Sequence, residues 1–285
     1  MVEFAWHRRV RQRRRPAALI LALSGWTDAG EAASTAASTL ERLAGLVPYA
    51  HVDPDELYDF TAVRPLVEID ERGVHGIQWG TLVLRGPARQ RGPAIFSLAG
   101  PEPQLRWKAL ASQIAEVAQG LAIQHVVTLG ALLAGTPHTR PVALVGFSTR
   151  PELARKLDLL PSHYEGPTGF LSVAQGVLQS SGVDVTSIWA EVPHYLAQFP
   201  AYPAALALAQ ATTTALDLDL DPTPELDLLI ARTAAEIDQY VSDDPELVSY
   251  VGSLEHSYEI DQRTRRSAER ISWEAQQYLR RFNAE

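Results

Sequence analysis

Short apolar runs alternate with helix-like segments along the chain as far as residue 190, and this alternation constrains the fold more than any other feature. Each run is rich in aliphatic residues and bounded by Gly, Pro or polar residues, as strands buried on both faces are. The segments between some of them, at about 29–45, 104–120 and 170–181, resemble helices. Strands that alternate with helices predict an α/β fold with a largely parallel sheet and helices on both faces. The predicted strands are 17–24, 94–98, 125–129, 142–147 and 183–190.

Two other segments depart from this alternation. Residues 65–86 hold two alternating runs joined by Arg72-Gly73, and we expect a hairpin there. The composition changes after about residue 215, where an acidic segment precedes apolar residues at helical spacing. The chain therefore divides into an α/β domain over 17–217 and a small helical C-terminal subdomain over 218–285.

Residues 1–16 are expected to form a basic N-terminal arm, because six arginines lie between Arg8 and Arg15. A basic segment before an apolar run is typical of a signal peptide. Here the run 17–24 is short, and Gly25-Trp26-Thr27-Asp28 follows it without a small-residue cleavage site. We therefore expect a solvated arm in front of a buried first strand.

The charge and cysteine content exclude several classes of protein. The net charge of −9 argues against binding to nucleic acid or to an anionic membrane, since both need a positive face. No apolar run approaches the roughly 20 residues that span a bilayer. The chain has no Cys, so it has no disulfide and no thiolate metal site. We expect a cytoplasmic protein that does not bind membranes or nucleic acid.

Four polar loops follow strand-like runs, at residues 100–108, 135–141, 164–169 and 192–195. They concentrate Gly, Pro, His, Arg, Glu and Tyr in a chain that is otherwise rich in Ala, Leu and Val. Ligands of open α/β sheets bind outside the carboxyl ends of the strands. The loops are therefore the candidate site.

Loops 100–108 and 135–141 each allow a functional and a structural interpretation. In the first, Arg106 can bind an anion beside the flat wall of Trp107, or it can pair with Glu102 at a helix N-terminus. In the second, Thr136, His138 and Arg140 offer a hydroxyl, a titratable imidazole and a bidentate anion clamp. The same loop also suits a rigid interface.

The other two loops leave the same choice open. In loop 164–169, Glu165 can act as a base and Gly166 allows close backbone approach beside Tyr164, or the loop is a turn before a helix capped by Thr168. His194 can move a proton next to Tyr195, or it can simply be hydrogen-bonded at the end of a strand.

No complete catalytic motif is present. Gly25 to Gly30 has the spacing of a phosphate loop but no Lys follows, and Gly146-Phe147-Ser148 lacks the second Gly of a nucleophile elbow. No His pair has zinc-helix spacing. We therefore expect no metal and no cofactor.

Six blocks in order resemble one family. The chain is similar to the actinobacterial branch of the proteasome assembly chaperone two family over about residues 15–255. The blocks are Gly25-Trp26-Thr27-Asp28-Ala29-Gly30, residues 58–65 (YDFTAVRP), Gly100-Pro101-Glu102-Pro103 with Leu105-Arg106-Trp107, residues 130–141 (GALLAGTPHTRP), Tyr164-Glu165-Gly166-Pro167-Thr168-Gly169 and Val192-Pro193-His194-Tyr195.

The resemblance implies a three-layer αβα sandwich of the phosphorylase/hydrolase type with a helical C-terminal appendage. It also implies a homo-oligomer, with a homotrimer as the expected form. Relatives act on proteasome subunits, the archaeal ones through a C-terminal hydrophobic–Tyr–any tripeptide. This sequence ends Asn283-Ala284-Glu285, so we do not expect it to dock in that way. The resemblance assigns no catalytic residue.

Two hypotheses follow. The first is a non-enzymatic, oligomeric protein that binds proteasome subunits or another protein partner. The second is a small-molecule binder or a nucleoside phosphorylase-like or hydrolase-like enzyme. In the second, Arg106 and Arg140 hold an anion and His138, Glu165 or His194 moves a proton. It requires these side chains and Glu102 to converge on one pocket.

Overall fold

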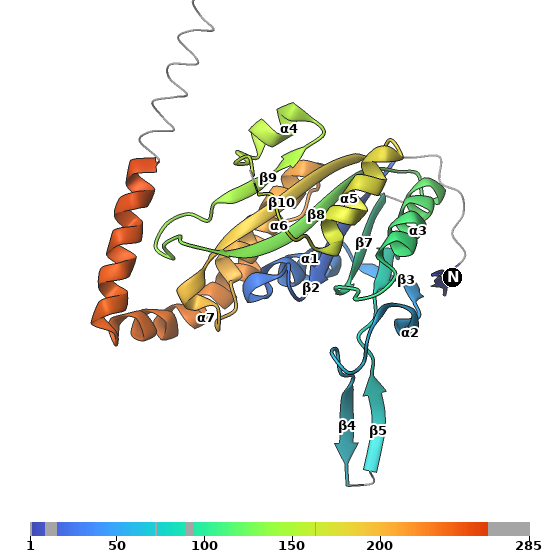
Figure 1. Ribbon diagram of the computed structural model, residues 1–285, viewed down its shortest axis with the longest axis horizontal. Coiled ribbons are helices and arrows are strands. Elements are labelled where there is room, and N and C mark those ends of the chain that lie inside the picture. The colour runs from blue at the N-terminus through green and yellow to red at the C-terminus, as the bar shows by residue number, and fades with distance from the viewer. Residues whose placement is uncertain (1, 9–15, 72, 89–93, 163, 262–285) are drawn as a thin grey trace, which may run out of the picture.

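One eight-stranded mixed sheet carries the fold, with helices on both of its faces (Figure 1). The computed structural model describes residues 2–8, 16–71, 73–88, 94–162 and 164–261. The strands of this sheet are β1 (Phe4–Trp6), β2 (Ala17–Ser24), β3 (Leu46–Val52), β6 (Val83–Pro87), β7 (Ala94–Pro101), β8 (Ile123–Ala134), β9 (Leu144–Ser148) and β10 (Asp184–Pro193). The helices are α1 (Ala32–Leu43), α2 (Pro54–Leu57), α3 (Trp107–Gly120), α4 (Pro151–Lys156), α5 (Phe170–Ser180), α6 (Tyr202–Leu216), α7 (Thr223–Ser242), a further helix over 245–261, and the short 3-10 helices η1 (Ala29–Glu31) and η2 (His194–Leu196).

The strand order is β1-β3-β6-β7-β2-β8-β10-β9. The four central strands β7, β2, β8 and β10 are parallel, as predicted, but the other strands join antiparallel. The prediction of a largely parallel sheet is therefore only half right. Parallel neighbours need a helical crossover, whereas β6 and β7 are joined by a short connection that permits antiparallel pairing.

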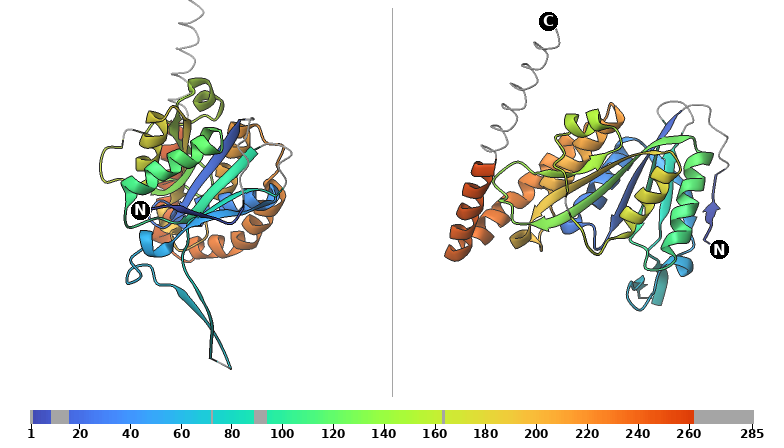
Figure 2. Two further views of the ribbon diagram at one scale, coloured as in Figure 1. Left: turned by 90° about the vertical axis from the view of Figure 1, so that its right-hand side faces the viewer. Right: turned by 45° about the horizontal axis from the view of Figure 1, so that its top comes forward.

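The alternation along β2 explains why both faces are covered. Leu19, Leu21 and Leu23 point into the core beneath α3 and α5, and Ile20 and Ala22 point into the core beneath α1 and α6. Successive side chains of a strand face opposite ways, so an all-apolar strand must be covered on both sides. The helix pairs α3–α5 and α1–α6 supply that cover (Figures 1 and 2).

The predicted hairpin is confirmed over part of its range. β4 (Leu66–Asp70) and β5 (Gly73–Gln78) form a separate two-stranded sheet that projects from the body (Figures 1 and 2). The prediction extended the second arm to Leu84, which is wrong. Val83 and Leu84 belong to β6, which pairs with β3 and β7 in the main sheet.

The N-terminal segment is not a solvated arm over its described part. Residues 4–6 form β1 on the edge of the sheet against β3, and Val2 and Phe4 are buried. Burying the apolar side chains of Val2 and Phe4 favours folding of this segment onto the edge of the sheet. Arginines 9 and 11, and those at 13–15, lie outside the described residues.

The C-terminal helices pack onto the body. Leu226 of α7 is fully buried in the core beneath α1 and α6. A smaller cluster of Leu196, Val241 and Val251 joins the end of β10 to α7 and to helix 245–261. The domain boundary at 217 stays a prediction, and Asn283-Ala284-Glu285 lie outside the described residues.

One buried imidazole makes the stability of the fold sensitive to acid. His125 in β8 is 6% exposed, and its Nε2 lies 2.8 Å from Thr186 Oγ1. Burial, assisted by the nearby Arg150, lowers the pKa of His125 from 6.5 to about 4. Between these values the unfolded chain binds a proton that the folded chain does not, so stability falls as the pH falls.

We expect the folded state to lose roughly 3 kcal/mol from this group between pH 7 and pH 4. His125→Gln keeps an amide nitrogen near the position of Nε2 and removes the titration. Thermal unfolding at pH 7 and pH 5 should show a drop in Tm that is several degrees smaller in the variant than in the native chain. Equal drops would contradict this assignment.

Candidate functional site

Loop 135–141 is held against the end of β10 by a pair of hydrogen bonds. Tyr195 Oη accepts from the backbone N–H of His138 at 2.9 Å and lies 2.8 Å from His138 Nδ1. The tautomer of His138 decides which of these two side-chain atoms donates to the other.

The electrostatics favour a neutral pair. Burial lowers the pKa of His138, although the nearby carboxylates of Asp238 and Glu255 oppose the shift. Burial also raises the pKa of Tyr195. Both groups are therefore uncharged at neutral pH, and the pair fixes the loop in place.

Arg140, predicted to clamp an anion, is paired within the chain. Its guanidinium lies 3.1 Å from Glu255 Oε1 and 3.1 Å from Glu259 Oε1, both on helix 245–261. Thr139 Oγ1 also donates to Glu255. The two carboxylates occupy the fork that would otherwise bind a ligand, so Arg140 ties the loop to the C-terminal helix.

Arg140→Ala is expected to loosen that helix without unfolding the body. The ion pairs are partly exposed, so their loss should cost about 1 kcal/mol or less. Hydrogen exchange of amides in 250–259 should accelerate several-fold, and Arg232→Ala on α7 serves as the matched control. Unchanged exchange in Arg140→Ala would show that the pairs do not hold the helix.

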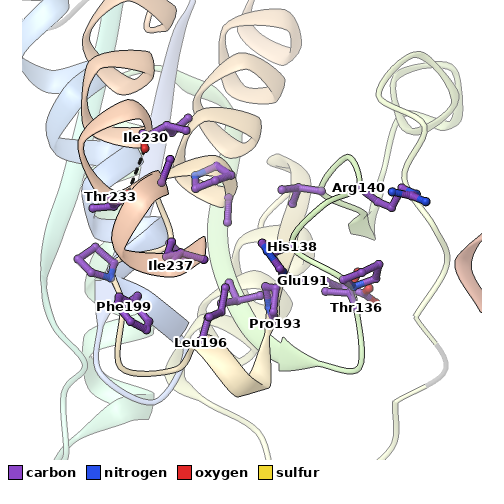
Figure 3. Close-up of a pocket in the computed structure, with 18 of the residues that line it drawn as sticks. Thr136, His138, Arg140, Glu191, Pro193, Leu196, Phe199, Ile230, Thr233 and Ile237 are labelled. Carbon is purple, nitrogen blue, oxygen red and sulfur yellow. Dashed lines mark hydrogen bonds between the residues drawn. The ribbon is translucent and has the colours of Figure 1, made fainter. Parts of the chain in front are cut away.

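A small cavity lies behind the loop, between the end of β10 and helices α6 and α7 (Figure 3). Its volume is about 170 Å³, and its lining is mostly apolar. The polar lining comes from Thr136, His138, Arg140, Glu191, Thr233 and Asp238. The cavity is smaller than the roughly 300–1,000 Å³ of ordinary ligand sites. It can hold no more than a small group.

Figure 3 shows the loop residues Thr136, His138 and Arg140 across the cavity from Ile230 and Ile237 of α7. Burial raises the pKa of Glu191, the carboxyl group on β10 that lines the same space. The Glu191 carboxyl therefore lines the same mostly apolar cavity as the His138 imidazole.

His194 belongs to an aromatic cluster beside this cavity. Its Nδ1 donates to the carbonyl of Ala134 at 3.1 Å, because a carbonyl can only accept. Its ring stands edge-on to Tyr195 and to Tyr250, with centroids 5.7 and 5.5 Å away. These contacts fit the interpretation of His194 as a hydrogen-bonded residue at the end of a strand. They also pack helix 245–261 against the body.

Loops 100–108 and 164–169 meet at a different place. Glu102 Oε1 accepts from the backbone N–H of Phe170 at 2.7 Å, so Glu102 caps α5 from outside that helix. The expected Glu102–Arg106 pair is absent, since Arg106 lies 2.8 Å from Glu56 instead. Trp107 Nε1 donates to the carbonyl of Pro103 at 2.6 Å. Glu102, Arg106 and Trp107 therefore each have a structural partner.

Loop 164–169 is a turn folded on itself. Tyr164 Oη donates to the carbonyl of Pro167 at 2.9 Å. A Cβ at Gly166 would lie 2.7 Å from the hydroxyl oxygen of Tyr164. Gly166 thus makes room for the ring of Tyr164. Thr168 does not cap α5, because Glu102 supplies the acceptor. Glu165 is exposed. It lines neither the cavity behind loop 135–141 nor a larger groove beside the start of α5.

The predicted residues therefore form two groups rather than one site. Thr136, His138, Arg140, His194 and Tyr195 lie together at the C-terminal helices. The second group, at the start of α3 and α5, comprises Glu102, Arg106, Trp107, Tyr164, Glu165 and Gly166. The convergence required by the enzyme hypothesis is not found for these residues.

Sequence reasoning missed four residues that complete the first group: Glu191, Asp238, Tyr250 and Glu255. Glu191 carried a usable signal, because it is the one charged residue in the otherwise apolar segment 188–193 at the end of β10. The other three lie on the C-terminal helices, and the sequence pattern of those helices does not indicate which face contacts the loop.

Within the described ranges, no group of three or more His, Cys, Asp or Glu side chains is placed to hold a metal ion. No described helix is both long enough and apolar enough to cross a membrane.

Comparison with known proteins identifies the family. The model of the PAC2 family matches residues 22–241. A PAC2 family protein from Streptomyces avermitilis is 35% identical, with a TM-score of 0.72, and the match covers 83% of this chain and 100% of that one. A proteasome-assembly chaperone homologue from Mycobacterium tuberculosis is 31% identical, with a TM-score of 0.74, and the match covers 82% and 99%.

A more distant structure shares the fold. The archaeal proteasome activator PbaB from Pyrococcus furiosus is 14% identical over 84% of this chain and 98% of its own, with a TM-score of 0.64. No curated protein matches the chain. The family model covers most of the chain, and two solved structures exceed 30% identity over more than two thirds of it. The chain therefore belongs to the PAC2 family.

Proposed function

We propose that the protein is a non-enzymatic, cytoplasmic homo-oligomer that binds protein partners, with proteasome subunits as the first candidates. The observation that carries this proposal is the β4–β5 hairpin. Its apolar side chains are exposed while it stands away from the body (Figure 1). We expect the copies to assemble as a homotrimer.

The hairpin lacks the features that would keep it stable by itself. Val67 faces Ile77 across the two strands, and Ile69 faces Val74. These four side chains are 49–68% exposed. An isolated two-stranded hairpin is marginal in water, and exposed apolar clusters mark protein contacts. Contact with another protein surface would stabilise the hairpin and bury its apolar side chains.

The polar loops support a binding role over a catalytic one. Arg140 is neutralised by two carboxylates, Glu102 caps a helix and Arg106 pairs with Glu56. Groups that are already satisfied within the fold rigidify it. The six side chains that the alternative enzyme needs are divided between two places, which leaves that alternative without its main support.

The finer description of the fold is also a proposal. Four parallel central strands with helices on both faces support a three-layer αβα sandwich of the phosphorylase/hydrolase type. Such a scaffold hosts many functions, so it does not itself argue for a phosphorylase or hydrolase reaction.

The partner is tested by affinity purification from the protein's own organism. Similar proteins are described as a proteasome-assembly chaperone homologue and a proteasome activator. We expect proteasome α-subunits to co-purify with the tagged native chain and to be depleted with a hairpin variant. If repeated purifications recover no proteasome subunit with either protein, the proposed partner is wrong.

A further inference from the structure

A larger groove lies at the carboxyl ends of the central strands, on the side of the sheet that carries α5. It is formed where β2 and β8 end, by the middle of β9 and by the loop before α5. Its volume is about 880 Å³. This falls within the roughly 300–1,000 Å³ of sites for small ligands, at the place where open α/β sheets bind them.

The lining of this groove carries no charge. None of the described residues that line it is Asp, Glu, Lys, Arg or His, although charged residues make up 21% of the chain. Among the described residues the groove offers no Arg, Lys or His to pair with a phosphate or carboxylate, and Glu102 already accepts from the N–H of Phe170 at the start of α5. The groove therefore favours an uncharged ligand.

Aromatic rings form the walls. Trp26 is 67% exposed, Phe147 41% and Tyr164 66%, and Trp189 lies deeper. A Cβ at Gly130 would lie 2.5 Å from the Trp189 ring, so the glycine makes room for that wall. Flat rings prefer stacked or edge-on contact with other rings.

The floor offers hydrogen bonds in a fixed geometry. Gln175 is 6% exposed, and its Nε2 donates to Thr128 Oγ1 at 2.6 Å and to Ser187 Oγ at 2.9 Å. Trp189 Nε1 also donates to Ser187 Oγ, at 3.1 Å. Among the described residues, nothing accepts the hydroxyl hydrogen of Ser187, which is 2% exposed, and nothing donates to Gln175 Oε1.

We propose that this groove binds an uncharged, flat, largely apolar small molecule that carries one hydrogen-bonding group. The rings of Trp26, Tyr164 and Trp189 contact its faces. The polar group meets the free hydrogen of Ser187 or the amide oxygen of Gln175. The proposal does not depend on the oligomer or on the proteasome partner.

A matched pair of fluorescent probes tests the charge preference. N-phenylnaphthylamine is neutral, and anilinonaphthalene sulfonate has the same rings with an added sulfonate. We expect saturable binding of one neutral probe per chain and at least about tenfold weaker binding of the sulfonate, since nothing neutralises it. Failure of the neutral probe to bind, or equal or tighter binding of the sulfonate, would overturn the proposal.

Substitutions locate the probe. Ser172 lines the groove from α5, and Ser180 lies at the other end of the same helix. Ser172→Trp should abolish binding of the neutral probe, whereas Ser180→Trp should leave it unchanged. Trp26→Ala should weaken binding by up to about tenfold and Trp26→Phe by less. Unchanged binding in both Ser172→Trp and Trp26→Ala would refute the site.

A protein segment is the rival occupant of the groove. If the neutral probe binds only after dilution has separated the copies, another copy covers the groove and the small-molecule proposal is wrong. Binding with the same affinity at all protein concentrations supports it.

Discussion

Replacing Ile69 by Lys together with Val74 by Glu is expected to dissociate the proposed homo-oligomer into monomers without unfolding the chain. The two side chains face each other across β4 and β5 and are 68% and 64% exposed. An opposite-charge pair across two strands preserves the hairpin. The same two charges, buried in a contact between copies, lose their hydration. We expect association to weaken about a hundredfold to a thousandfold, since a buried ion pair is about 1–4 kcal/mol less favourable than apolar side chains of similar volume.

The control places the same charges on other exposed apolar positions. Leu228→Lys with Val248→Glu changes two side chains on the C-terminal helices that are 54% and 48% exposed. This control should associate as the native chain does, and both variants should keep the native far-UV circular dichroism and Tm. Equal dissociation of both variants, or of neither, would remove the hairpin from the contact.

Gly100→Ala is expected to cause a large loss of stability. Gly100 has φ of +158°, and an added Cβ would lie 2.5 Å from the Thr81 carbonyl oxygen and 2.8 Å from Leu82 Cα. Both neighbours are backbone atoms beside β6, so they cannot move away as a side chain would. Strain and overpacking together should cost about 3–5 kcal/mol, a fall in Tm of roughly 10 °C.

Gly176→Ala is the matched control for that change. Gly176 lies inside α5, and an added Cβ there meets no atom within 4 Å. This variant should gain about 0.5–1 kcal/mol, because alanine favours a helix over glycine. Denaturant unfolding of the two variants checks both signs. A native-like midpoint for Gly100→Ala would contradict the packing described at the end of β7.

The strands that could be predicted are those with a continuous apolar run in their own sequence. The predicted strand 17–24 coincides with β2, because every position there is apolar or small. Strand β3 was missed because Pro48 and His51 interrupt its apolar run. Helix α6 was missed for the opposite reason. Its alanines, leucines and threonines show no polar face, since the helix is largely buried between the sheet and α7.

The candidate site could be predicted only in its loops. The sequence shows where His138, Arg140 and Glu102 lie, but their partners are set by tertiary structure. Arg140 meets a carboxylate 115 residues away and Glu102 caps a helix 68 residues away. The same side chains are therefore equally compatible with a ligand site and with docking surfaces inside the fold. Only the arrangement of the helices decides between these two uses.

We expect the exposed hairpin to be covered by protein, and in the first place by another copy of this chain. Light scattering of the purified native protein during size-exclusion chromatography measures this. We expect a molar mass that is a whole multiple of one chain, threefold for the proposed trimer, and that falls to one chain in the Ile69→Lys, Val74→Glu variant. The molar mass of a single chain for the native protein, at every concentration from nanomolar to high micromolar, would contradict it.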